Sequence, residues 1–267
     1  MRRRAHLFLL LVACLVSCTR RAPVAPVGTG VRVTFFDVGQ GDAALVRTPE
    51  GNAVLIDTGK GPDTAGLLAA EGVSRLDLLI VSHPHADHEG GLEAVLRAFP
   101  VSEVWYAGRF RGRARKLLET HGARPVAAGA GKQLGRLALT VLHPQPGVVL
   151  DGVNNNSLVV KAAYNGHRYL FPGDCELGCW EQLFKRRRPE LRSDVLKAAH
   201  HGSGNGTNSG VLGNVRPSTV VISCGRDNNY GHPHPLVLKL IGRLGAKLFR
   251  TDQQGAIRCA GVECAAR

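Results

Sequence analysis

The chain has 267 residues, of which 44% are hydrophobic and 5% aromatic, and its formal net charge is +13. This length accommodates one large domain or two small ones, with a sizeable buried core. No segment after the N-terminal region is apolar enough to cross a membrane, which excludes a transmembrane channel, and the positive charge favours anionic partners such as nucleic acid.

The N-terminal segment is predicted to be a signal peptide of the lipoprotein type that covers residues 1–17. Three arginines in the first four residues precede an apolar region at 7–16, which is too short to span a bilayer well. This region ends in Leu-Val-Ser-Cys, which resembles the lipobox of bacterial lipoproteins and makes Cys18 the lipid-modified residue. Cys14 also ends such a tetrapeptide, but it leaves a very short apolar region.

We therefore expect an exported protein that a lipid on Cys18 anchors to a bacterial membrane, in the periplasm or on the cell surface. An ordinary secretory signal is the alternative, and the protein would then be secreted. Residues 18–30 are rich in Pro and Gly and are predicted to form a flexible tether. Loss of residues 1–17 removes three of the 13 net positive charges and leaves +10.

From residue 31 onward, strand-like and helix-like segments alternate without a long linker, which predicts one domain over residues 31–267. Apolar runs bounded by turn residues predict strands at 31–36, 43–48, 52–57, 76–81, 103–106, 137–142, 157–163, 168–171, 194–199 and 219–223. Helical spacing predicts helices at 63–71, 91–98, 113–121, 176–186 and 235–244. Asn165 and Gly166 predict a tight hairpin between two strands. This order favours an α/β fold with two facing mixed sheets and helices outside.

Export permits disulfide bonds. Cys175 with Cys179 and Cys259 with Cys264 are the two candidate pairs, because each pair would close a short loop. An odd number of cysteines remains if Cys18 carries lipid, so one thiol has no assigned partner.

Residues 83–88 read His-Pro-His-Ala-Asp-His and follow the predicted strand at 76–81. Pro84 prevents a continuing helix, so we expect the cluster on a loop at the end of that strand. Neutral imidazole and carboxylate groups suit zinc, manganese and iron. Four such groups on one short loop do not fit comfortably around one ion, so the cluster predicts a site for two metal ions.

Further polar motifs lie at the ends of other predicted strands, where an α/β sandwich would place its active-site edge. They are Asp-Val-Gly-Gln-Gly-Asp at 37–42, Asp-Thr-Gly at 57–59, Asn-Asn-Asn-Ser at 154–157, Pro-Gly-Asp at 172–174, His-His-Gly-Ser at 200–203 and Asn-Asn-Tyr-Gly-His-Pro-His at 228–234. Each motif alone is typical of a turn. Together they indicate one polar site at one edge of the sandwich.

With these motifs the chain resembles the metallo-β-lactamase-fold hydrolases, and in particular the ComEC-like branch, whose hydrolase domain belongs to a DNA-uptake protein. The His-x-His-x-Asp-His motif is specific for the superfamily, and its combination with the motifs at 37–42, 154–157 and 200–203 is typical of the branch. The resemblance covers nearly the whole mature chain. It implies a four-layer αββα sandwich with a two-metal site at its edge. The ComEC membrane channel has no counterpart here, so transport itself is not implied.

The resemblance also implies a ligand set for two divalent ions, Zn²⁺ or Mn²⁺. His83 and His85 would hold one ion, and Asp87 and His88 would hold the other. Asp174 would bridge both ions.

Two positions in this ligand set stay open. Either His200 or His201 would complete the second site, and we favour His201 because Gly202 follows it as in related enzymes, although alternation along a strand allows either. The superfamily usually supplies a further histidine before the bridging carboxylate, where this chain has the stretch 154–156. An amide oxygen is a weaker ligand than imidazole, which would loosen the first site and favour manganese. His143 is an alternative replacement.

The remaining polar residues are assigned by role. Asp87 would orient the nucleophile as well as bind metal, and Asp57 would accept the N–H of a ligand histidine and so fix its tautomer. His232 would donate a proton to a leaving oxygen or hold a phosphate, or else it is only a turn residue. The other residues expected to support the ligands or contact substrate are Asp37, Asp42, Asn155, Asn156, Ser157, Ser203 and Tyr230.

The resemblance and the positive charge predict a metal-dependent hydrolase that uses a hydroxide activated by two metal ions on phosphodiesters. DNA or another nucleic acid is the expected substrate, in a role related to competence. One alternative is hydrolysis of another secreted substrate, such as a phosphocholine ester, a lactam or a lactone. The other is a nucleic-acid-binding lipoprotein without catalysis, whose binding would depend steeply on salt.

Overall fold

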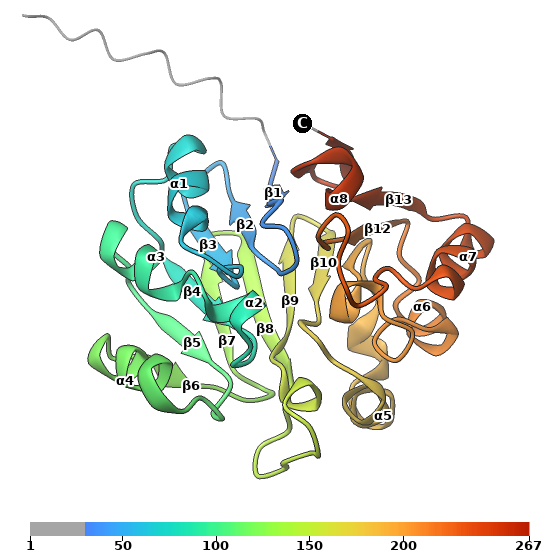
Figure 1. Cartoon of the computed structure of the whole chain (residues 1–267), viewed down its shortest axis with the longest axis horizontal. Coiled ribbons are helices and arrows are strands. Elements are labelled where there is room, and N and C mark those ends of the chain that lie inside the picture. The colour runs from blue at the N-terminus through green and yellow to red at the C-terminus, as the bar shows by residue number, and fades with distance from the viewer. Residues whose placement is uncertain (1–29, 267) are drawn as a thin grey trace, which may run out of the picture.

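The computed structural model describes residues 30–266, which form two facing sheets with helices on their outer surfaces (Figure 1). The predicted signal peptide, Cys18 and all but the last residue of the predicted tether lie outside the described residues. Within 30–266, no helix combines the length and the apolar character that a bilayer span requires.

The first sheet has eight strands in the order β15-β14-β1-β2-β3-β4-β5-β6. They are β1 (Arg32–Phe35), β2 (Ala44–Arg47), β3 (Ala53–Ile56), β4 (Leu78–Val81), β5 (Val104–Tyr106), β6 (Arg124–Pro125), β14 (Ile257–Ala260) and β15 (Glu263–Ala266). The pairs from β3 to β6 are parallel. β3 and β4 are apolar and buried at every position, as expected for parallel strands that are covered on both faces.

The second sheet has seven strands in the order β13-β12-β11-β10-β9-β8-β7. They are β7 (Gly131–Leu134), β8 (Leu137–His143), β9 (Val159–Tyr164), β10 (His167–Phe171), β11 (Val195–Lys197), β12 (Thr219–Ile222) and β13 (Lys247–Arg250). The predicted hairpin is confirmed: β9 and β10 pair antiparallel, and the turn residues Asn165 and Gly166 have φ angles of 47° and 86°.

Helices cover the outer face of each sheet (Figure 1). α1 (Asp63–Ala70), α3 (Leu92–Ala98) and α4 (Gly112–Thr120) lie on the first sheet, and α5 (Leu177–Arg186), α6 (Ser209–Val215) and α7 (Pro235–Leu244) lie on the second. The apolar core fills the space between the sheets, where Phe35 of β1 stacks on Phe171 of β10 with ring centroids 5.9 Å apart. The predicted αββα sandwich is confirmed.

The sequence prediction differs from the structure at several short elements. The histidine cluster is not wholly a loop, because Ala86–Glu89 form the one-turn helix α2. Helices α6 and α8 (Thr251–Gln254) and strands β6, β7, β13, β14 and β15 were not predicted. These elements are too short or too polar to show a hydrophobic periodicity. The strands among them are stabilised by pairing within the sheets rather than by the intrinsic propensity of their residues.

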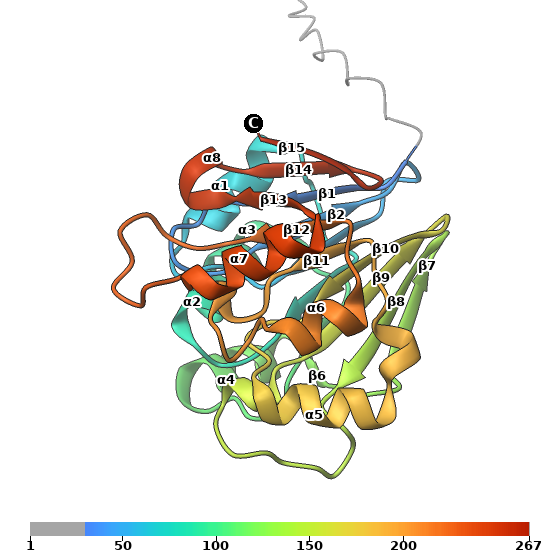
Figure 2. The same ribbon diagram turned by 90° about the vertical axis from the view of Figure 1, so that its right-hand side faces the viewer.

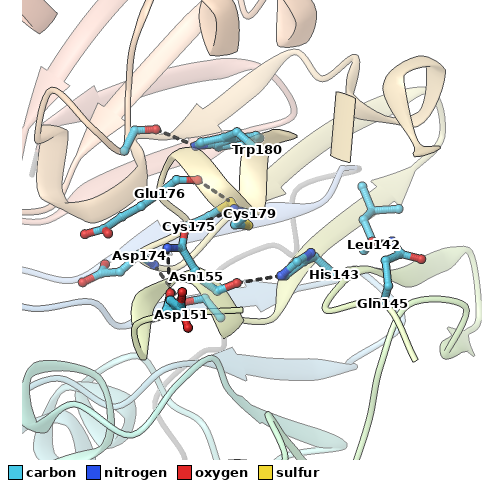
Figure 3. Close-up of a disulfide and its surroundings, with 12 residues drawn as sticks. Leu142, His143, Gln145, Asp151, Asn155, Asp174, Cys175, Glu176, Cys179 and Trp180 are labelled. Carbon is cyan, nitrogen blue, oxygen red and sulfur yellow. Dashed lines mark hydrogen bonds between the residues drawn. A yellow bond between two sulfur atoms is a disulfide. The ribbon is translucent and has the colours of Figure 1, made fainter. Parts of the chain in front are cut away.

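Both predicted disulfides are confirmed. Cys259 and Cys264 pair across β14 and β15, and Cys175 is bonded to Cys179 (Figure 3). Cys224 is the free cysteine of the described region, and it is buried. The Cys175–Cys179 bond ties the residue after Asp174 to the first turn of α5.

Candidate metal centre

The polar motifs meet at one edge of the sandwich because the strands that precede them end there. β1, β3 and β4 of the first sheet run in the same direction, and so do β10, β11 and β12 of the second. The segments that follow these six strands carry the histidine cluster and five of the six further motifs, whereas the motif at 154–157 lies between β8 and β9. The two sheets thus contribute side chains to the same site from opposite layers.

His88, on α2, is fully buried and contacts two carboxylates. Its Nδ1 lies 2.9 Å from Oδ2 of Asp57, and its Nε2 lies 3.2 Å from Oδ1 of Asp174. Burial opposes protonation of the ring, but Asp174 and Asp57 outweigh it and raise the pKa of His88 well above its ordinary value.

His201 faces His88 from the other sheet. Its Nδ1 donates to the carbonyl oxygen of Ser223 at 2.9 Å, so its Nε2 carries the lone pair in the neutral ring. This Nε2 lies 3.3 Å from Nε2 of His88 and 3.2 Å from Oδ2 of Asp87. Burial opposes protonation here as well, but Asp174 and Asp42 raise the pKa of His201 to about 9.

This arrangement fits a bound cation. The Nδ1 atoms of His88 and His201 both donate to oxygen acceptors, so once a metal ion displaces the Nε2 protons, two Nε2 lone pairs and two carboxylates are directed at one place. The four ligand atoms, from Asp87, His88, Asp174 and His201, lie within 4.8 Å of one another. Within residues 30–266, the buried Oδ1 of Asp174 accepts no hydrogen bond of good geometry. A divalent ion would satisfy all four groups.

The remaining ligand atoms lie beside this set and come from His83, His85 and Asp174. In chain order, His83, His85 and Asp174 are named the first ligand group, and Asp87, His88, Asp174 and His201 the second. Nε2 of His83 is 3.1 Å from Nδ1 of His85 and 3.6 Å from Oδ2 of Asp174. The two carboxylate oxygens of Asp174 therefore face different groups. Burial and the neighbouring His88 lower the pKa of His83 well below its ordinary value, so this ring is neutral and its nitrogen is free to bind metal.

Asp57 orients a histidine of each ligand group through hydrogen bonds. Its Oδ2 accepts from Nδ1 of His88 at 2.9 Å and from the hydroxyl of Ser82 at 2.8 Å. The Ser82 hydroxyl lies 3.0 Å from Nδ1 of His83. Because the hydroxyl donates to Asp57, it accepts the His83 N–H, and Nε2 of His83 points to Asp174. One buried carboxylate thus sets the tautomer of a histidine in each group.

Asp42 forms an ion pair with Lys197, a residue that the sequence analysis did not single out. Both side chains are nearly fully buried, and Asp42 also lies 3.5 Å from Nδ1 of His201. Burial opposes ionisation of Asp42, but Lys197 and His201 together lower its pKa. Asp42, Asp57 and His88 form a third cluster of possible ligands, but Lys197 already provides a cation there. The sequence feature that could have indicated this buried ion pair is a lysine inside the short apolar run at 195–199.

His200 lies outside both groups of ligand atoms. Its Nδ1 is 2.9 Å from Oε1 of Glu176, and its Nε2 is 3.7 Å from Oδ2 of Asp174. Glu176, which the sequence analysis also missed, accepts from the side chain of Asn154 at 3.0 Å. Both His200 and His201 have positive φ angles, 49° and 52°, so strand alternation does not apply to them.

The side chains of Asn155 and Asn156 contact neighbouring backbone rather than the ligand groups. Asn155 donates to Asp151 and accepts the N–H of Cys179 at 3.1 Å (Figure 3). Asn156 contacts the backbone of residues 150 and 152. His143 lies outside the ligand groups too, since its Nε2 donates to the carbonyl oxygen of Asn155 at 2.8 Å.

The other predicted residues occupy different places around the site. The Ser157 hydroxyl accepts from the backbone N–H of Asp174 at 3.3 Å, whereas Asp37 is exposed and accepts from Gly39 within its own turn. The Ser203 hydroxyl contacts Asn205 and accepts the N–H of residue 206. Ser157 thus supports a proposed ligand, and Asp37 does not.

His232 lies against the second ligand group, with its ring centroid 6.2 Å from that of His201 and 5.2 Å from that of His200. Burial and His200 lower the pKa of His232 to about 4. The ring is therefore neutral at pH 7, which favours holding a phosphate through its N–H over donating a proton.

The metal-free protein should lose stability as the pH rises from about 6.5 to 9. The pKa of His201 is raised from 6.5 to about 9, so its contribution is complete below pH 6.5 and disappears through pH 9. We expect a loss of about 3 kcal/mol in the free energy of unfolding. Urea unfolding with a chelator at pH 6.5 and pH 9 measures it, and constant or rising stability would contradict the assignment.

The sequence model of the metallo-β-lactamase superfamily matches residues 36–213. ComE operon protein 3 of Bacillus subtilis is 32% identical over 253 residues, which cover 85% of this chain and 32% of that protein. Competence protein ComA of Neisseria gonorrhoeae is 34% identical over 230 residues, with the same two coverages. The chain thus spans about a third of the length of these relatives.

Solved structures share the fold at low sequence identity. YhfI from Bacillus subtilis, a metallo-β-lactamase fold protein, has a TM-score of 0.57 at 12% identity, over 86% of this chain and all of that one. The diiron β-hydroxylase CmlA from Streptomyces venezuelae has a TM-score of 0.59 at 13% identity, over 88% of this chain and 55% of that one. Together with the sequence match over most of the sandwich, these similarities establish that the chain belongs to the metallo-β-lactamase superfamily.

Proposed function

We propose that this protein is a metal-dependent hydrolase of phosphodiesters, with DNA or another nucleic acid as substrate. The observation that carries the proposal is the shared carboxylate: Oδ1 of Asp174 lies 3.2 Å from His88, and Oδ2 lies 3.6 Å from His83. A carboxylate placed between two groups of ligands is the arrangement that two-metal hydrolysis needs. Zn²⁺ and Mn²⁺ are the ions that suit this donor set.

Bound divalent ions would supply Lewis acidity to a phosphate oxygen and lower the pKa of a water molecule. The protein's own residues orient the reactants. Burial opposes ionisation of Asp87, but His201 and His88 lower its pKa, so its carboxylate is charged at neutral pH and can accept a hydrogen bond from the attacking water. His232, neutral at pH 7, offers a ring N–H to a phosphate oxygen beside the second ligand group.

The choice of nucleic acid is supported by charge and by relatives. The chain has a formal charge of +13, which attracts polyanions. One relative is named competence protein ComA and another ComE operon protein 3, and together with the resemblance to the ComEC-like branch these names favour a role related to DNA uptake. Export and anchoring through Cys18 remain part of the proposal, and the two disulfides support an oxidising compartment.

The test uses protein that lacks residues 1–18, loaded with Mn²⁺ or Zn²⁺. Substrates are single- and double-stranded DNA, bis-p-nitrophenyl phosphate, a phosphocholine ester and a lactone. We expect cleavage of the phosphodiesters that depends on metal, is abolished by His85→Ala and is unchanged by Asp37→Ala. Hydrolysis of only the phosphocholine ester or the lactone would mean that the substrate is of that class and not a phosphodiester of nucleic acid. Binding without any cleavage, or activity that survives His85→Ala, would contradict the proposed mechanism.

A further inference from the structure

We propose that Tyr230 is a stacking platform for a nucleobase of single-stranded nucleic acid, next to the phosphate held at the metal centre. The inference rests on the proposed function and names the form of the substrate. Tyr230 is 70% exposed, and it lies on the loop between β12 and α7, which projects from the sandwich (Figure 2).

Three rings lead from this exposed position to the metal centre. The ring of Tyr230 stacks on that of His232, with centroids 5.8 Å apart and an interplanar angle of 24°. His232 stacks in turn on His201, with centroids 6.2 Å apart and an angle of 28°. His201 belongs to the second ligand group. Tyr230 is therefore two ring spacings from a proposed metal ligand, within reach of the nucleotide whose phosphate would lie there.

The loop holds Tyr230 in place before any ligand arrives. Oδ1 of Asn228 accepts the backbone N–H of Tyr230 at 3.2 Å and that of His232 at 3.0 Å. Its amide group donates to the carbonyl oxygens of Gly225 and His232. Gly225 packs so closely on Gln40 that an added Cβ would lie 2.7 Å from its backbone nitrogen. A preorganised aromatic ring loses little entropy on binding, which favours recognition.

The charged side chains near the loop that carries Tyr230 balance one another. They favour base stacking, rather than attraction by net charge, as the role of this loop. His232 also lines a cavity of about 550 Å³, which is large enough for a nucleotide. Two arginines and two aspartates, Arg226, Arg250, Asp227 and Asp252, share its wall, and Arg250 is paired with Asp252 at 2.6 Å. The local charges balance, so an aromatic face is the distinctive feature offered to the strand.

A platform of this kind selects unpaired strands. Every base has a π face, and in a duplex both faces are covered by neighbouring base pairs. Stacking on one aromatic side chain contributes enough that its removal weakens binding by about 5- to 150-fold. Tyr230 would thus give the site a preference for single strands without reading their sequence.

The test compares Tyr230→Ala and Tyr230→Phe with the wild-type protein lacking residues 1–18. Fluorescence anisotropy measures binding of a thymidine 12-mer, an abasic strand of the same length and a duplex, and cleavage is followed with bound metal. Leu236→Ala is the control, because Leu236 is also exposed, at 51%, on the neighbouring helix. We expect Tyr230→Ala to lower the affinity for the thymidine 12-mer by about 5- to 150-fold. Abasic-strand binding should stay unchanged, and Tyr230→Phe should retain wild-type affinity.

Equal affinities of wild type and Tyr230→Ala for the thymidine 12-mer would overturn the inference, and so would an equal loss on the abasic strand. Because wild-type cleavage of DNA is scored separately, these results would leave the proposed function intact. If the wild-type protein neither binds nor cleaves any strand, both proposals are wrong.

Discussion

Replacement of Asp174 by Ala is expected to remove metal binding from both ligand groups at once. Its oxygens lie against different groups, and within residues 30–266 it is the one side chain that belongs to both ligand groups. Loss of a residue that only orients a metal ligand costs about 10- to 100-fold in affinity, and loss of a shared ligand should cost more. Isothermal titration with Zn²⁺ and Mn²⁺ measures the number of ions bound and their affinities.

Two further variants serve as controls for Asp174→Ala. His85→Ala removes a ligand of the first group alone and should leave one ion bound. Asp37→Ala removes an exposed aspartate outside the groups and should leave both. If Asp174→Ala lost only one ion, the carboxylate would belong to one group and would not be shared.

Lys197→Met is expected to destabilise the metal-free protein by about 3–5 kcal/mol, the cost of breaking a buried ion pair from one side. The substitution leaves Asp42 charged and buried, with its Lys197 partner gone. Urea unfolding at pH 7 with a chelator measures the free energy of unfolding. The double variant Lys197→Met/Asp42→Asn should recover part of the loss, because it removes the uncompensated charge.

Lys247→Met is the matched control, since Lys247 forms a 3.1 Å ion pair with Glu263 in which both side chains are largely exposed. An exposed pair contributes about 0–1 kcal/mol. If Lys197→Met lowered the free energy of unfolding by no more than Lys247→Met does, the buried ion pair would not stabilise the metal-free protein.

The local part of the site could be predicted from the sequence, because residues 83–88 carry four potential ligands, three histidines and one aspartate, within six positions. Asp174 and His201 lie far from them along the chain; the motifs that contain them were identified at strand ends, but their roles as metal ligands were assigned only through the family resemblance. The choice between His200 and His201 depends on two successive positive φ angles, which no periodicity reveals. Lys197 was missed because a single lysine in an apolar strand does not indicate which carboxylate will face it.

The long apolar strands and amphipathic helices of the fold could be predicted in the same way. β13, with the sequence Lys-Leu-Phe-Arg, could not, because its strand character comes from parallel pairing with β12. β14 is held by pairing with β1, and β15 by pairing with β14 and by the Cys259–Cys264 disulfide. Such contacts between distant segments are invisible to local patterns.

The central claim, that two ions share Asp174, is tested most directly by anomalous diffraction from crystals of the protein grown with Mn²⁺ or Zn²⁺. We predict two anomalous peaks, one beside Oδ1 of Asp174 among His88, His201 and Asp87, the other beside Oδ2 near His83 and His85. A single peak, or peaks that do not contact Asp174, would contradict the claim.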